Sequence, residues 1–304
     1  MNLDRREFVT GALAGAGLLA TGGLEALAQP AAPPSTDPFQ MRKLGKTGVK
    51  VSLIGLGTGM SGFNRQSNHT RMGREKFNRL VQHAYERGVR LFDCADIYGT
   101  HSYLAEALQG VPRKSYAIAT KIWYHQGGIP EVDRPEPHVF VERFLKELKT
   151  DTIDVLQLHC MQSPEWQEPM ARHMEGLEEL KRQKVIRAHG ISIHNLGAMR
   201  TAVSTAWVDA CHVRINAYGD SMDDRDPEKV VPVIRDLHKA GKGVIGMKLA
   251  GEGRYRNAPE KRLASVRYAL ATGAVDTMVV GCETPEEIDD FAALTRQALE
   301  AMKA

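Results

Sequence analysis

Four side chains that could carry out proton transfer stand at or just beyond the ends of short apolar runs. Asp93 ends "VRLFD", Tyr98 follows it on the next turn, Lys121 ends "SYAIATK" and His159 ends "IDVLQLH". An apolar run that stops at a polar residue is typical of a buried strand that delivers this residue at its C-terminal end. Buried charges are costly unless they are paired. The four residues are therefore interpreted as parts of one site.

These residue types suit the delivery of a proton to an oxygen atom. Tyrosine has an unperturbed pKa of about 10, and a neighbouring lysine favours the phenolate and lowers this pKa. We therefore assign Tyr98 as general acid, Lys121 as the group that lowers the pKa of Tyr98, and Asp93 as the anchor of Lys121. His159 is expected to orient a carbonyl oxygen. Such a site would protonate the oxyanion formed when hydride reaches a carbonyl carbon, and would catalyse the reverse oxidation.

Strand-like runs and amphipathic helical patterns alternate along the chain after residue 50. Eight such runs, from "VSLIGLG" to "VDTMVVG", are each followed by a helical pattern. Strands that are separated by helices pair in parallel, and eight such units favour a closed (β/α)8 TIM barrel of the α/β class. The segment "MRKLGKTGVKV" predicts an N-terminal β-hairpin before the barrel. No G-x-G-x-x-G stands at a strand-to-helix turn, so a Rossmann domain is not predicted.

Four segments carry a resemblance to a known family: "GVRLFDCADIYG", "ATKIW", "TDTIDVLQLH" and "GISIHN". In this order and at these spacings the chain resembles the aldo-keto reductases, from about Met41 to Leu294. The resemblance implies an enzyme that binds NAD or NADP, and the family's catalytic tetrad falls on the same four residues, Asp93, Tyr98, Lys121 and His159. Trp123 matches an aromatic residue of the family's substrate pocket. A loop aromatic that merely packs on the barrel rim would look the same.

The resemblance implies a further set of cofactor-binding residues, which depart in part from the family pattern. Relatives hold the nicotinamide with a Ser-Asn pair, a Gln and a stacking Tyr. Here Ile193 replaces the Asn, and the expected contacts are Ser192, Asn195, His212, Met247 and Lys248. Lys248 begins the glycine-rich segment "KLAGEG", which could meet a pyrophosphate.

Acidic residues follow the last predicted strand, where NADP-preferring relatives carry Lys or Arg. Gly281 begins this segment, and Glu283, Glu286 and Glu287 are expected to repel a 2′-phosphate. The chain is therefore predicted to use NAD(P) without a strong preference for NADP. The same acids are also favoured in the first turn of a helix by the helix dipole, which leaves a different phosphate site possible.

The N-terminal segment differs in composition from the rest of the chain. Arg5 and Arg6 precede a mildly hydrophobic run and the cleavage signature Ala26-Leu27-Ala28, which resembles a twin-arginine export signal. The run is shorter than the ~20 apolar residues of a membrane span, so no stable membrane span is expected after cleavage. We predict a signal peptide over residues 1–28, a flexible linker over 29–37 and the barrel over 38–304. The twin-arginine export machinery would be a partner, and the mature protein would be periplasmic.

Composition and charge narrow the remaining function classes. The formal net charge is +3, with acids and bases interspersed, so no nucleic-acid partner is expected. The expected substrate is a small carbonyl or alcohol compound, such as an aldehyde, a ketone or a sugar. One alternative is a metal-dependent barrel hydrolase built on His159, His189, His194 and His212, although no metal-site spacing is present and no metal is predicted. Another alternative is a cofactor-sensing barrel with little catalysis.

Overall fold

The computed structural model describes residues 35–303, so the predicted signal peptide and residues 29–34 of the predicted linker lie outside the described residues. Eight parallel strands form a closed barrel in the order β10-β3-β4-β5-β6-β7-β8-β9. The strands are β3 (Ile54–Gly57), β4 (Leu91–Asp93), β5 (Ala117–Ile122), β6 (Ile153–Met161), β7 (Ile186–Ile193), β8 (Ala210–Arg214), β9 (Gly243–Met247) and β10 (Thr277–Gly281). The predicted (β/α)8 barrel is confirmed.

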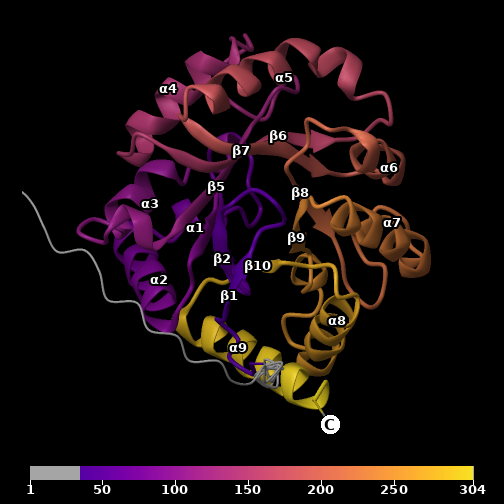
Figure 1. Cartoon of the computed structure of the whole chain (residues 1–304). Coiled ribbons are helices and arrows are strands. Elements are labelled where there is room, and N and C mark those ends of the chain that lie inside the picture. The colour runs from indigo at the N-terminus through magenta and orange to yellow at the C-terminus, as the bar shows by residue number, and fades with distance from the viewer. Residues whose placement is uncertain (1–34, 304) are drawn as a thin grey trace, which may run out of the picture. The chain divides into compact units, whose positions relative to one another are not determined.

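Helices surround the barrel and complete the alternation of strand and helix (Figure 1). They are α1 (Asn68–Arg71), α2 (Arg74–Arg87), α3 (His101–Ala107), α4 (Pro137–Leu148), α5 (Gln167–Arg182), α6 (Leu196–Ser204), α7 (Pro227–Lys239), α8 (Pro259–Ala271) and α9 (Pro285–Ala301). Helix α4 illustrates how the local sequence sets the start, the buried face and the end of a helix. Pro137 fits its first turn, Phe140 and Phe144 face the core, and Lys149 ends it in a left-handed conformation.

The predicted N-terminal hairpin is also present and closes one end of the barrel. Strands β1 (Met41–Lys43) and β2 (Lys50–Ser52) pair in antiparallel fashion. Leu44, Val49 and Val51 of this segment are fully buried, and they belong to one apolar cluster with residues from seven of the barrel strands. The hairpin therefore fills the end of the barrel at which the strands begin.

The apolar cluster inside the barrel fixes which side chains reach the opposite end. It contains Leu91 of β4, Ala119 of β5, Val155 of β6 and Ala210 of β8. Side chains alternate between the two faces of a strand, so residues two or four positions later also face the interior. These positions carry buried polar residues that face the inside of the barrel, namely Asp93, Lys121, Gln157, His159 and His212. The strand register thus gathers them at the C-terminal mouth of the barrel, where barrel enzymes place their active sites.

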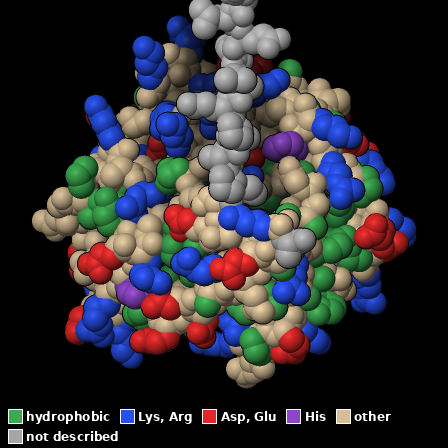
Figure 2. All heavy atoms as spheres, turned by 60° about the horizontal axis from the view of Figure 1, so that its bottom comes forward, with side chains coloured by type: hydrophobic (Ala, Val, Ile, Leu, Met, Phe, Trp, Pro, Cys, Tyr) green, Lys and Arg blue, Asp and Glu red, His purple; other side chains and the backbone are tan. Residues whose placement is uncertain are grey.

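The outer surface carries both signs of charge. On the lower part of the face shown in Figure 2, acidic and basic side chains alternate over the helices, as expected for a solvated helix layer. Within the described residues, no helix combines the length and the apolar character that crossing a membrane requires. All four cysteines are buried and free, and burial raises the pKa of the Cys211 thiol to about 12.

Candidate active site

A buried ion pair lies at the centre of the predicted proton-transfer group. Lys121 Nζ lies 2.5 Å from Asp93 Oδ1 and donates a second hydrogen bond to the carbonyl oxygen of Cys94, at 2.9 Å. Burial alone would raise the pKa of Asp93, but Lys121 and His212 outweigh it and the pKa is lowered. Asp93 is therefore charged at neutral pH and fixes the position of Lys121, as the sequence predicts.

Tyr98 reaches the mouth from a short 3-10 helix, η1 (Asp96–Tyr98), directly after β4. Its ring lies edge-on to that of His159, with 5.6 Å between the ring centroids, and Lys121 Nζ lies 5.5 Å from the Tyr98 centroid. Gly59 and Gly62 pack against the same ring so closely that a Cβ atom on either would overlap it. The glycines after the first barrel strand therefore make room for the phenol.

One sequence-based expectation needs correction, namely that Lys121 lowers the pKa of Tyr98. Burial raises the pKa of Tyr98 well above its ordinary value, and the negative charge of Asp93 adds to this effect. The reason is that Lys121 is paired with Asp93 and bonded to the Cys94 carbonyl, so its charge is largely compensated. In the protein alone, Tyr98 holds its proton throughout the neutral range and is a donor rather than a phenolate.

His159 and Trp123 complete this group of side chains at the barrel mouth. Burial lowers the pKa of His159 well below its ordinary value, and the nearby charge of Lys121 acts in the same direction. The imidazole is therefore neutral near pH 7 and keeps one N–H donor. The Trp123 ring lies 5.2 Å from the His159 ring, centroid to centroid, and its Nε1 donates to the carbonyl oxygen of Gly127 at 2.7 Å. Trp123 thus stands beside the predicted reaction centre.

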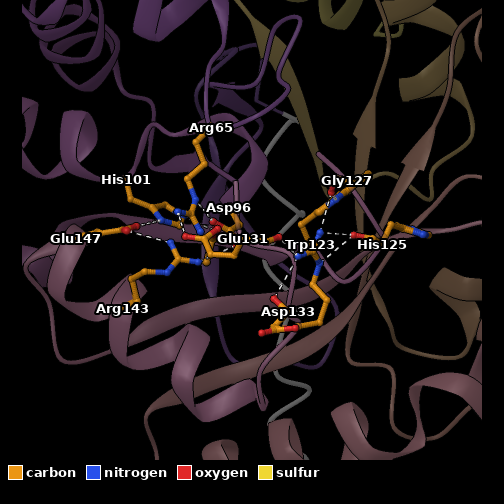
Figure 3. Close-up of polar contacts among 12 residues, drawn as sticks. Arg65, Asp96, His101, Trp123, His125, Gly127, Glu131, Asp133, Arg143 and Glu147 are labelled. Atoms are coloured by element: carbon orange, nitrogen blue, oxygen red, sulfur yellow. Dashed lines mark hydrogen bonds and ion pairs between the residues drawn. The ribbon is translucent and has the colours of Figure 1, made fainter. Parts of the chain in front are cut away.

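A charged network outside the barrel holds the segment that carries Tyr98 (Figure 3). The buried Asp96 carboxylate accepts from Arg65 Nε at 2.9 Å and from Arg143 Nη2 at 2.8 Å. Arg143 also contacts Glu147, which bonds His101 Nδ1 at 2.8 Å. Arg65 comes from the loop after β3 and Arg143 from α4, so two distant segments clamp η1. A rigid first turn after β4 positions the phenol.

A cavity of about 510 Å³ opens beside Asp93 and Tyr98, within the range of roughly 300–1,000 Å³ of small-molecule sites. Its lining comes from the ends of β3, β9 and β10, the loop after β9, and helices α8 and α9. The lining side chains that matter most for binding a ligand are Met247, Lys248, Arg256, Arg262, Glu287 and Phe291. Arg262 Nε is buried without a hydrogen-bond partner among the described residues. An elongated ligand with anionic groups and one flat ring fits this set of donors and the aromatic Phe291.

The predicted cofactor contacts fall into two groups in the structure. Met247, Lys248 and Gly281 line the cavity, with Lys248 Nζ 2.6 Å from Glu252. Three others have partners within the protein. Ser192 Oγ accepts from the Cys160 N–H at 2.8 Å, and Asn195 caps α6 by accepting from the Ala198 N–H. His212 Nε2 lies 3.0 Å from Asp93 Oδ1, inside the barrel. The roles of these three in cofactor binding stay predictions.

The acidic segment after β10 is paired rather than free. Arg256 contacts Glu283 at 2.5 Å and Glu287 at 2.6 Å, and Asn68 donates to Glu283 at 2.9 Å. Glu286 is exposed. Pairing with Arg256 therefore weakens the repulsion that was expected between these acids and a 2′-phosphate. The pairs oppose phosphate binding in another way, because a phosphate that approaches Arg256 must displace two glutamates.

Arg256, Arg262, Phe291 and Gln157 were not predicted as parts of the site. The first three approach the cavity from a loop and two helices, and nothing in their local sequence marks this. Gln157 could have been found, because it is the one polar side chain inside the apolar run "VLQL" and stands two positions before His159, on the same strand face. Of the four histidines of the hydrolase alternative, His159 and His194 lie 6.5 Å apart between ring centroids, but not all four face one point. His189, for example, pairs with Glu178 and stacks on Trp207, towards the helices. Residues 35–303 contain no group of three potential metal ligands.

Comparisons with known proteins agree with this geometry. The model of the aldo/keto reductase family matches residues 54–263. Among curated relatives, L-galactose dehydrogenase of Arabidopsis thaliana is 26% identical over 159 residues, which cover 51% of this chain and 48% of the relative. Methylglyoxal reductase DkgB of Salmonella typhi is 31% identical over 138 residues, 45% of this chain and 49% of the relative. The chain thus spans about half the length of either relative.

Solved structures resemble nearly the whole described barrel. Aldo-keto reductase AKR11C1 of Bacillus halodurans, in its holo form, has a TM-score of 0.66 at 22% identity, over 87% of this chain and 96% of that one. An aldo-keto reductase of Klebsiella pneumoniae, solved in complex with NADPH, has a TM-score of 0.63 at 18% identity, over 84% of this chain and 89% of that one. At these identities the likeness concerns the fold.

Proposed function

Because the chain belongs to the aldo/keto reductase family, we propose that it is an oxidoreductase that transfers a hydride between a nicotinamide nucleotide and a small carbonyl or alcohol compound. The observation that carries the proposal is the convergence of Asp93, Tyr98, Lys121 and His159 at the barrel mouth, with the 510 Å³ cavity beside them. The two curated relatives, L-galactose dehydrogenase and methylglyoxal reductase, are named for reactions of the same kind, the oxidation of an alcohol or the reduction of a carbonyl compound.

In the proposed reaction each side chain has a separate role at the oxygen atom of the substrate. A bound nicotinamide supplies the hydride in reduction and accepts it in oxidation. As the carbonyl carbon is reduced, negative charge develops on its oxygen, and the neutral His159 donates a hydrogen bond to that oxygen. Tyr98 Oη releases its proton to the same oxygen and completes the alcohol. Asp93 holds Lys121 in place beside the tyrosine ring. Trp123 would contact the substrate.

The cavity residues would hold the nucleotide. Lys248, Arg256 and Arg262 are cationic and would bind phosphate oxygens, and Phe291 offers a flat face to a base. Met247 stands at the end of β9, where it would pack on the nicotinamide. Because Arg256 is held by Glu283 and Glu287, we propose that NADP is not strongly preferred over NAD. A carboxylate near the ribose is also a usual partner of the 2′-hydroxyl.

The proposal is tested by nucleotide binding and turnover. The purified barrel is denatured and the released nucleotide identified, and the folded protein is titrated with NADH and NADPH while their fluorescence is followed. Aldehydes, ketones and sugars are then screened for nucleotide oxidation, and alcohols for reduction. We expect binding of NADH at least as tight as that of NADPH, together with turnover of a carbonyl or alcohol compound. Absence of nucleotide binding would contradict the proposal.

We also propose that the chain is exported by the twin-arginine machinery after its cofactor has been loaded. The support is the sequence of residues 1–28 alone, with Arg5-Arg6 and Ala26-Leu27-Ala28. An exported nicotinamide enzyme would find little free cofactor outside the cytoplasm, so tight retention would be required. N-terminal sequencing of the protein from periplasmic extracts is expected to begin at Gln29. A full-length cytoplasmic protein would contradict export.

A further inference from the structure

The loop between β5 and α4, residues 123–136, is built around the side chain of Arg134. Its Nε donates to the carbonyl oxygen of His125 at 2.9 Å, and its Nη2 donates to the carbonyl oxygens of His125 at 2.6 Å and Gly127 at 2.9 Å. Its Nη1 donates to the carbonyl oxygens of the three preceding residues, Glu131, Val132 and Asp133. Within the described residues, every hydrogen bond of this guanidinium thus goes to the backbone of its own loop.

The side chain of Trp123 shares one of these acceptors. The carbonyl oxygen of Gly127 accepts from Trp123 Nε1 at 2.7 Å as well as from Arg134, and Figure 3 shows Trp123, Gly127 and His125 side by side. An indole has a single N–H donor, so this bond fixes the direction of the ring edge. Gly128 lies against the same edge, because a Cβ atom there would be 2.5 Å from Trp123 Nε1.

The turn that carries this shared acceptor has little restraint of its own. Gly127 and Gly128 both have a positive φ, 68° and 77°, in a region where glycine is freer than any other residue. The indole that depends on this turn lies 5.2 Å from the ring of His159, centroid to centroid. A change in the turn would therefore move a ring that stands next to the proposed reaction centre.

We propose that Arg134 is a positioning residue that fixes the indole of Trp123 through the Gly127 carbonyl and thereby shapes the substrate side of the site. The inference rests on the proposed function, because it takes Trp123 as a contact of the substrate. The indole offers a flat apolar face. Arg134 should therefore matter most for carbonyl compounds that carry an apolar ring beside the carbonyl group, and least for small aliphatic aldehydes.

The rest of the loop is held by contacts that do not involve Arg134. The Asn64 N–H donates to the carbonyl oxygen of Gly128 at 2.8 Å, and Arg65 Nη1 lies 2.6 Å from Glu131 Oε1. Both contacts tie the loop to the segment after β3. Loss of the Arg134 guanidinium should therefore loosen the Gly127 carbonyl without detaching the loop from the barrel.

The kinetic test measures KM for a ring-bearing and a small aliphatic carbonyl compound, with benzaldehyde and acetaldehyde as first choices. We expect Arg134→Leu to raise KM for the ring-bearing compound roughly threefold to tenfold, the range that one hydrogen bond contributes. The KM for the small compound should rise less. Both kcat and the affinity for the nucleotide should change by less than about twofold, as for a loss of ground-state binding. Arg134→Lys keeps some of the donors and should restore part of the affinity.

A double-mutant cycle shows whether Arg134 acts through Trp123. Trp123→Phe keeps an apolar ring but lacks the N–H that bonds Gly127, so Arg134→Leu should add little to KM in this background. Arg172→Leu is the matched control, because Arg172 pairs with Glu136 at the end of the same loop, 2.6 Å away, and should leave KM unchanged. An unchanged KM in Arg134→Leu, an equal rise with and without the indole N–H, or an equal rise in the control would overturn the inference. A fall in kcat at constant KM would also overturn it.

A second measurement is independent of turnover. Protein labelled with 5-fluorotryptophan contains three fluorinated side chains, and the 19F signal of Trp123 is assigned by its loss in Trp123→Phe. We expect Arg134→Leu to shift or broaden this signal and to leave those of Trp166 and Trp207 in place. An unmoved Trp123 signal would contradict the proposed link. If the wild type turns over no carbonyl or alcohol compound but the signal moves, the proposed function fails while the hold of Arg134 on Trp123 is supported.

Discussion

At the scale of single residues, the site relies on pairs of side chains that change each other's protonation. Burial lowers the pKa of His159 and raises the pKa of Tyr98, so both side chains are neutral near pH 7, whereas Asp93 stays charged because Lys121 and His212 outweigh the effect of burial on its pKa. Two neutral donors and one compensated ion pair therefore lie together at the barrel mouth. This arrangement differs from the phenolate-stabilising arrangement expected from the sequence, although the same residues take part.

Replacement of Tyr98 by phenylalanine tests the proton-transfer role at this scale. The change removes one hydroxyl group and keeps the ring that packs on Gly59 and Gly62. We expect kcat to fall by roughly 10²- to 10⁴-fold, since the general acid is lost, with nucleotide affinity nearly unchanged. Steady-state kinetics and nucleotide titration measure both quantities. Tyr103→Phe, on α3, is the control and should keep wild-type kcat. Full turnover in Tyr98→Phe would instead favour the cofactor-sensing barrel.

At the scale of elements, the loops after the strands decide what the mouth binds. The segment after β10 leads into α9 with Glu283 and Glu287 on Arg256, while the loop after β9 supplies Lys248 and Arg256. The same cations could hold a phosphate or stay with their glutamates. Nucleotide preference therefore depends on the competition between two carboxylates of the protein and the phosphate of the ligand.

The double substitution Glu283→Gln with Glu287→Gln tests this competition. It should release Arg256 and raise the affinity for NADPH relative to NADH roughly tenfold, about 1.4 kcal/mol. Fluorescence titration of both nucleotides measures the ratio. Glu286→Gln is the matched control, since Glu286 lies in the same helical turn but is exposed. The same change of ratio in the control, or none in the double variant, would show that these pairs do not set the preference.

At the scale of the whole molecule, buried and half-buried ion pairs tie the loops to the barrel. Glu147 is an example, because it connects α4 to α3 through His101 and shares Arg143 with Asp96 (Figure 3). Burial alone would raise the pKa of Glu147, but the hydrogen bond with His101 and the contact with Arg143 outweigh it and lower the pKa to about 2. The carboxylate thus stabilises the folded state at neutral pH.

Replacement of Glu147 by glutamine predicts a specific pH dependence of stability. An unfolded glutamate has a pKa of about 4.3, so the stabilising contribution is complete above this pH and is lost as the pH falls through about 2. Because Glu147 is partly exposed, we expect a loss of only about 1 kcal/mol at pH 7. Urea unfolding of Glu147→Gln and wild type should show this difference shrinking below pH 4. Glu300→Gln, an exposed residue of α9, is the control; a constant difference at all pH values would contradict the assignment.

The sequence by itself determined the barrel and brought Asp93, Tyr98, Lys121 and His159 together as a predicted proton-transfer group, because both depend on local patterns. Apolar runs that end in Asp93, Lys121 and His159 alternate with amphipathic helices, and strand periodicity then places these side chains at one end of the barrel. The four motifs that carry the family resemblance lie in these same segments.

Only the tertiary structure decided how the polar groups are paired. The placement of His212 on Asp93 depends on the register between β4 and β8, which are not neighbours in the barrel. Arg256 meets Glu283 and Glu287 although 27 and 31 residues separate them, and Arg262 and Phe291 reach the cavity from different helices. The pKa of Tyr98 likewise follows from burial and from the pairing of Lys121, neither of which a linear spacing contains. Electrostatics depend on distances through space, so a residue's charge partner is known only once the chain has folded.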